Sequence, residues 1–65
     1  MSAESELTPR IGVVARRELA LHGITGYDDL TVRSRAELLA IHGVGPKAIR
    51  ILEEELAARR QSFAG

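Results

Sequence analysis

Cysteine is absent from this sequence, and aromatic residues nearly so, with one tyrosine, one phenylalanine and no tryptophan. Without cysteine the chain can form neither a disulfide bond nor a thiolate metal site. Because so few rings are present, the 45% of the 65 residues that are hydrophobic have to build an aliphatic core. A chain of this length forms one small domain that buries a modest share of its surface.

Long hydrophobic runs are also missing. No segment approaches the roughly 18 apolar residues that indicate a membrane span. The polar, acidic start MSAESE is unlike a secretory signal. We therefore expect a cytoplasmic protein with no membrane partner.

The sequence has no excess of charge of one sign, because nine Lys and Arg balance nine Asp and Glu. Taken alone, a net charge of zero argues against nucleic acid as a partner. The distribution is uneven, however. Residues 42–50 contain Lys47 and Arg50 and no acid, and residues 7–26 contain three arginines and one acid. Basic charge thus accompanies two glycine-bearing turns, although a mixed, solvated surface would give the same pattern.

The alternation of apolar and polar residues that is typical of β-strands is found nowhere in the chain. Residues 1–7 are predicted to form a disordered tail with nothing to bury, and residues 8–64 to form a single domain. Within that domain, apolar residues recur at helical spacing. The predicted fold class is therefore all-α, a compact bundle of four to five short helices.

Local start and stop signals give approximate helix bounds. Gly23 stands where a glycine commonly ends a helix. Ser34 and Glu37 form the S-x-x-E capping box, and Pro46 suits the first position of a helix. The expected helices span about residues 12–22, 35–41 and 46–60, with a short helix anchored by Leu30 between the first two.

The segment HGVGP, residues 42–46, interrupts the apolar helical pattern. Because this turn has to reverse the chain between two helices, we expect a positive φ at Gly43 or Gly45. Val44, between the two glycines, is expected to insert into the core and fix the turn.

The helix that follows this turn begins with amides that have no acceptor in the helix. Such donors and the positive end of the helix dipole attract anions, and Lys47 adds a full charge there, with Arg50 one turn further. The matching ligand is a phosphate oxygen, although an ordinary corner between helices would explain the same glycine spacing. The amides expected to be free are those of Val44, Gly45, Lys47 and Ala48.

A weaker copy of this pattern occurs 33 residues earlier, where IGVVARREL aligns with VGPKAIRIL. Both segments follow the pattern apolar-Gly-x-x-Ala-x-Arg-x-Leu. Val14 stands where the second copy has Lys47. Two such units packed about a pseudo-twofold axis would place both glycine turns on one side of the domain. The aligned pairs are Ile11 and Val44, Gly12 and Gly45, Ala15 and Ala48, Arg17 and Arg50, and Leu19 and Leu52.

The stretch LLAIHGVGPKAIRIL resembles the helix-hairpin-helix motif, whose consensus is close to L-x-x-I-x-G-[IV]-G-x-K-x-A-x-x-I. The stretches GITGYDDLTVRSRAELLAIHGVGPKAI and LAARRQSFAG carry a second likeness, by which residues 8–64 resemble the C-terminal domain of the bacterial RNA polymerase alpha subunit. That resemblance implies a compact, SAM-like orthogonal bundle of five helices with two hairpin units, of which the first in the chain is degenerate here. The matching motif residues are Leu38, Ile41, Gly43, Val44, Gly45 and Lys47.

These resemblances imply binding of duplex DNA without strong sequence preference, through phosphates across a minor groove, in a nucleoid-associated bacterial protein. Where the polymerase domain has an arginine early in its first helix, this chain has Val14. The expected DNA-binding residues are His42, Gly43, Val44, Gly45, Lys47, Ala48 and Arg50. A possible second contact comprises Arg10, Gly12, Arg16 and Arg17.

We expect neither an enzyme nor a cofactor or metal site. The sequence shows no nucleophile accompanied by a general base and no spacing of residues typical of metal ligands. His22 and His42 each precede a glycine at a helix end, where histidines commonly act as caps. The run of three glutamates at 53–55 is interpreted as a solvated face. The alternative function is a protein-docking module of a nucleic-acid or transcription complex with little direct DNA affinity. The kind of nucleic acid and the oligomeric state stay open.

Overall fold

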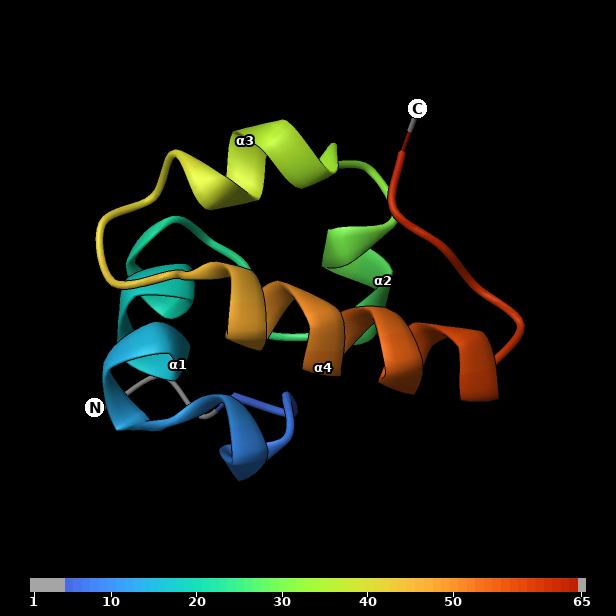
Figure 1. Cartoon of the computed structure of the whole chain (residues 1–65), viewed down its shortest axis with the longest axis horizontal. Coiled ribbons are helices and arrows are strands. Elements are labelled where there is room, and N and C mark those ends of the chain that lie inside the picture. The colour runs from blue at the N-terminus through green and yellow to red at the C-terminus, as the bar shows by residue number, and fades with distance from the viewer. Residues whose placement is uncertain (1–4, 65) are drawn as a thin grey trace.

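Four α-helices and one 3-10 helix make up the regular structure of the computed structural model, which describes residues 5–64. The part of the chain that the structure describes contains no strand, only an isolated bridge between Ser34 and Ala64. The predicted all-α fold class is therefore confirmed. Figure 1 shows α4 crossing the front of the molecule, with α3 above it and α1 to one side. The elements are η1 (Pro9–Ile11), α1 (Val13–Leu21), α2 (Tyr27–Leu30), α3 (Arg35–Leu39) and α4 (Pro46–Ala58).

The predicted capping box begins α3. The hydroxyl of Ser34 accepts a hydrogen bond from the Glu37 amide at 3.1 Å, and the Glu37 carboxylate accepts one from the Ser34 amide at 2.7 Å. The hydrogen bond from the Ser34 backbone is the largest cause of a lowered pKa of the Glu37 carboxyl, and the Ser34 side chain lowers it further. The charged form of Glu37 is thus part of the helix start.

Short α2 begins in a related way. The Asp29 carboxylate accepts hydrogen bonds from the amides of Thr25 and Gly26 at 3.1 and 3.0 Å. An acid in the first turn also faces the positive end of the helix dipole. Leu30, the predicted anchor of this helix, is fully buried.

Two helices end in the same left-handed arrangement. After α1, Gly23 has a φ of 79°, and the Ile24 amide donates to the Leu19 carbonyl at 2.8 Å. After α4, Arg60 has a φ of 58°, and the Gln61 amide donates to the Leu56 carbonyl at 2.8 Å. Both are Schellman caps, in which glycine is the usual left-handed residue. The second cap ends α4 two residues before the predicted bound of 60.

The core is aliphatic, as the composition requires. It lies between the helices, and its buried side chains come from every α-helix. Tyr27 and Phe63, the two aromatic residues, are only partly buried and pack against its edge. The largest fully buried side chains are Leu7, Leu19, Ile24, Leu30, Leu38, Ile49, Leu52 and Leu56.

Leu7 corrects one sequence prediction. It was expected to lie in a tail with nothing to bury, yet its side chain is 1% exposed and belongs to the core. The preceding residues are also held in place, because the Glu6 amide donates to the Thr25 carbonyl at 2.6 Å. The Arg16 guanidinium donates to the Ser5 carbonyl at 2.7 Å. Residues 5–7 therefore belong to the folded domain, and the rest of the predicted tail, residues 1–4, lies outside the described residues.

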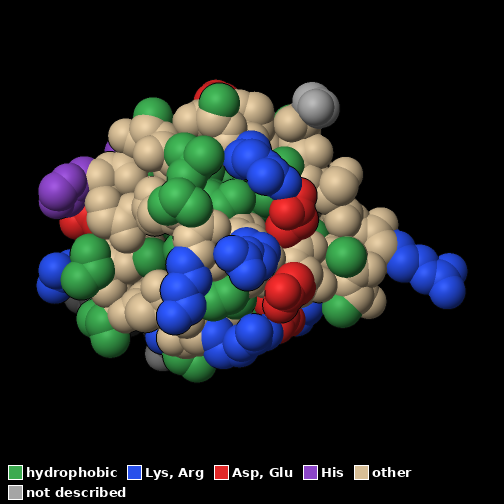
Figure 2. Space-filling view, viewed as in Figure 1, with side chains coloured by type: hydrophobic (Ala, Val, Ile, Leu, Met, Phe, Trp, Pro, Cys, Tyr) green, Lys and Arg blue, Asp and Glu red, His purple; other side chains and the backbone are tan. Residues whose placement is uncertain are grey.

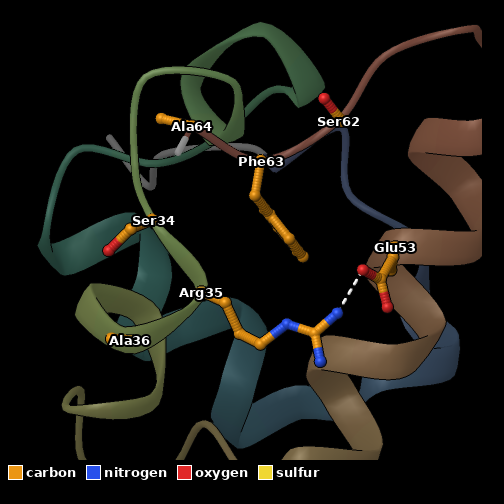
Figure 3. A pocket seen from close by; sticks show the side chains of 7 residues that line it. All are labelled: Ser34, Arg35, Ala36, Glu53, Ser62, Phe63 and Ala64. Atoms are coloured by element: carbon orange, nitrogen blue, oxygen red, sulfur yellow. Dashed lines mark hydrogen bonds and ion pairs between the residues drawn. The ribbon is translucent and has the colours of Figure 1, made fainter.

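The C-terminal segment turns back after α4 and returns toward the start of α3 (Figure 1). The Ala64 amide donates to the Arg33 carbonyl at 2.9 Å and closes this return. The return leaves a hollow of about 460 Å³. Figure 3 shows Phe63 of the returning segment pointing into it. On the other side of it, Arg35 of α3 forms an ion pair with Glu53 of α4.

Candidate functional site

The turn between α3 and α4 has the backbone that its sequence predicts. Gly43 has a φ of 90°, which confirms the expected positive φ. Val44 is buried in the core, also as expected. Its amide, however, donates to the Ile41 carbonyl at 3.1 Å. The prediction of a free donor at Val44 is therefore wrong, because the turn uses this amide to close itself.

Gly43 lies directly against α1. A Cβ atom at this position would lie 2.9 Å from Cγ1 of Val14 and 3.1 Å from Cγ of Glu18. A larger residue would thus meet both a strained backbone and a steric clash. The turn is consequently positioned by α1 as well as by the two helices that it joins.

The start of α4 presents unpaired donors. Gly45 is the N-cap, no side chain caps the helix, and Pro46 follows at the first position. The first amide bonded into the helix is that of Ile49, which donates to the Gly45 carbonyl at 3.1 Å. Within residues 5–64, no hydrogen bond uses the amides of Gly45, Lys47 or Ala48. These three amides are free for an anion.

The start of α1 has the same character. Gly12 is its N-cap without a side-chain cap, and the Arg16 amide donates to the Gly12 carbonyl at 3.1 Å. Among the described residues, the amides of Val13, Val14 and Ala15 have no acceptor. The aligned glycines of the two sequence copies, Gly12 and Gly45, therefore both precede a helix with unpaired amides.

The two copies also differ. Gly12 has a φ of 95°, whereas Gly45 has a φ of −103°. The first copy is preceded by η1 and the second by the turn after α3. Ile11 is partly buried, whereas its counterpart Val44 is buried; the next aligned positions agree. Ala15, Ala48, Leu19 and Leu52 are buried, while Arg17 and Arg50 are exposed.

Both glycine turns open into one hollow of about 260 Å³. This agrees with the expectation that they lie on one side of the domain. Arg10 and Lys47 are its basic members, and Figure 2 shows Lys and Arg side chains gathered over the first half of α4, with acidic side chains beside them. The lining residues are Arg10, Ile11, Gly12, Gly43, Gly45, Lys47, Ala48 and Ile51.

Arg10 is held by acids of α4. Its guanidinium lies 3.5 Å from Oε1 of Glu54 and 3.3 Å from Oε2 of Glu55. Such exposed ion pairs contribute about 0–1 kcal/mol each, so Arg10 can exchange them for another anion. Lys47 forms no ion pair with any residue of the described chain and is exposed. The acidic run 53–55, interpreted from sequence as a plain solvated face, thus anchors arginines.

Other predicted site residues lie outside the hollow. Arg16 is half-buried, and its guanidinium is committed to the Ser5 carbonyl. Arg17, His42 and Arg50 are exposed but do not line the hollow. The structure therefore brings together Arg10, Gly12 and the 43–48 segment, and it leaves Arg16 in a structural contact. Sequence reasoning missed Ile11 and Ile51, which form the apolar wall.

His22 has the capping role expected of it, because its Nδ1 lies 2.9 Å from the Glu18 carbonyl oxygen at the end of α1. No group of three or more potential metal ligands occurs in the chain between residues 5 and 64. Over the same residues, no helix has the length and apolar character needed to cross a membrane.

Comparisons with protein-family models, with curated proteins and with solved structures gave no significant match. The resemblance to helix-hairpin-helix domains and to the polymerase domain therefore stays a prediction. A functional conclusion has to come from the geometry of this chain.

Proposed function

We propose that this protein binds the phosphate backbone of duplex DNA without strong sequence preference. The observation that carries the proposal is the shared hollow, where two helix starts with unpaired amides meet the side chains of Lys47 and Arg10. Amides and a helix dipole hold a phosphate oxygen, and the two side chains supply the full charge. The chemistry of the site thus fits phosphate groups that repeat along a polymer, as in the DNA backbone.

The expected binding is weak. If the hollow and its rim contact three or four phosphates, counterion release gives a log–log salt slope of about −3. The net charge of zero provides no long-range attraction, and Glu54 and Glu55 compete with phosphate for Arg10. We expect a micromolar or weaker affinity at physiological salt.

Fluorescence anisotropy with a labelled 20-base-pair duplex, titrated from about 20 to 200 mM salt, tests the proposal. Lys47→Glu should weaken binding about tenfold or more at low salt and reduce the slope by about one. Arg60→Glu is the matched control, because it makes the same charge change on an exposed residue beyond the other end of α4. Equal losses in both variants would mean that only overall charge matters and would reject the site.

A protein-docking function is the second candidate, and the exposed apolar side chains of α1 favour it. An amide NMR titration with a short duplex at about 20 mM salt separates the two. Shifts confined to residues 11–17 and 42–48 are expected for DNA binding at the hollow. Absence of any shift would reject DNA binding and leave docking.

A further inference from the structure

Helix α1 is apolar on two opposite faces. Ala15 and Leu19 are buried in the core, whereas Val13, Val14 and Leu21 are 76%, 49% and 73% exposed. At about 3.6 residues per turn, these three fall on the half of the helix away from the core. Figure 2 shows hydrophobic side chains at the surface over α1, at the left edge of the view. The exposed apolar side chains of α1 therefore form a surface that no other part of the described chain covers.

Two charges of opposite sign lie between Val14 and Leu21 on α1. Arg17 is exposed and Glu18 is half-buried, and neither forms an ion pair with any described residue. Neighbouring residues in a helix point in different directions, so these two do not neutralise each other. Helix α1 therefore offers one unpaired charge of each sign between Val14 and Leu21.

The order of these four residues is self-complementary. The pair Arg17 and Glu18 and the pair Val14 and Leu21 share one midpoint along the helix. A twofold axis through that point, with two copies of α1 antiparallel, sets Val14 against Leu21 of the second copy. The same axis sets Arg17 against Glu18 of the second copy, and each contact occurs twice, as in an isologous interface.

We propose that two copies of this chain associate through the outward face of α1. A second copy fits better than an unrelated partner because it supplies both the apolar side chains and the matching charges in the right order. The interface goes beyond the proposed DNA binding and does not depend on it. Since it is built on one nine-residue helix, it falls below the size of stable interfaces, and a weak, reversible dimer is expected.

The dimer would have one geometric consequence for the turn after α3. Val14 and Glu18, which belong to the docking face, are also the residues that lie against the Gly43 position. Pairing of α1 with its copy therefore brings two such turns beside a single interface. When two weak phosphate-binding sites are held in one dimer, binding of a polymer at the first site raises its effective concentration at the second.

Sedimentation equilibrium of the full chain without DNA, from about 10 µM to 1 mM, tests the association. The wild type should show a concentration-dependent rise in mass toward a dimer. Leu21→Glu should raise the dissociation constant of the dimer about tenfold or more. The reason is that the substituted side chain is buried at two places in each dimer, once from each copy. Val32→Glu is the matched control, since Val32 is equally exposed but lies on the connection between α2 and α3. It should leave the dissociation constant unchanged.

Charge reversal provides a second, independent measurement. Arg17→Glu or Glu18→Arg alone should weaken the dimer, because each creates two like-charge contacts across the axis. The double variant R17E/E18R should recover the wild-type association, since the contacts are reversed but kept. Far-UV circular dichroism of each variant checks that the fold is intact. A monomer at every concentration, equal losses for Leu21→Glu and Val32→Glu, or no recovery in the double variant would each overturn the proposal.

Discussion

The Cβ position of Gly43 lies 2.9 Å from Cγ1 of Val14, so the turn after α3 and the first turn of α1 are in direct contact. Two residues that are 29 positions apart thus fix how the two helix starts face each other. This close approach is possible because Gly43 has no side chain.

Gly43→Ala should therefore destabilise the fold by about 2–3 kcal/mol, since a positive φ and a steric clash act together. Gly45→Ala is the comparison, because its φ is −103° and a Cβ there meets nothing within 4 Å. Only a small loss from the weaker N-cap is expected in that variant. Urea unfolding monitored by circular dichroism measures both, and equal losses would contradict the role assigned to Gly43.

Arg60→Gly should stabilise the protein by about 0.5–1 kcal/mol. Arg60 is the one non-glycine residue of the described chain with a positive φ, and it occupies a cap position where glycine carries no Cβ penalty. The gain is reduced by the greater freedom of glycine in the unfolded chain. Arg60→Ala keeps the Cβ atom and should change the midpoint of thermal unfolding little. A gain of the same size in both variants would assign the effect to charge.

Acid should weaken the start of α3. Because the folded state lowers the pKa of Glu37 below its ordinary value of 4.5, the unfolded chain binds the proton more readily. The contribution of Glu37 to stability is complete above that ordinary value and is lost as the pH falls through the lowered pKa. Thermal unfolding between about pH 2 and pH 7 should show a smaller acid-induced decrease in Glu37→Gln.

The NMR titration of the Glu37 carboxyl carbon gives a direct measure of the same cap. Ser34→Ala removes the hydroxyl but keeps the backbone amide, which is the largest cause of the lowered pKa. The pKa of Glu37 should therefore move only part of the way back toward 4.5. A complete return would show that the hydroxyl alone is responsible.

Removal of the acids beside Arg10 should strengthen DNA binding. In Glu54→Gln/Glu55→Gln the guanidinium loses both of its partners, so phosphate meets less competition. We expect a gain of about two- to tenfold in affinity at low salt, measured by anisotropy. The same double substitution in an Arg10→Gln background is the control, and there the gain should largely disappear. An undiminished gain would indicate a general charge effect.

Much of the fold could be predicted because its signals are local. Ser34 with Glu37, Pro46 and Gly23 each act within a few residues, and each has the predicted place at a helix end. The spacing of the two glycines around Val44 was equally informative for the turn. These features depend on backbone geometry that neighbouring residues fix by themselves.

Features that depend on distant partners were missed. Leu7 is a single apolar residue in a polar stretch, so no periodicity indicates its burial. Arg16 is a possible DNA contact by sequence, but its guanidinium donates to a backbone carbonyl, which sequence patterns do not reveal. The contact of Arg10 with Glu54 joins positions 44 residues apart and exists only once η1 packs on α4.

Tyr27 lies where the two ends of the fold meet. Its hydroxyl accepts a hydrogen bond from the Thr8 amide at 3.0 Å, and the Arg59 guanidinium stacks 3.9 Å from the ring centroid. Because the chain has one tyrosine and no tryptophan, this position dominates its intrinsic fluorescence. Tyr27 is therefore an intrinsic fluorescent probe. Its emission reports, without an added label, whether the contact between the N-terminal segment and the end of α4 is intact.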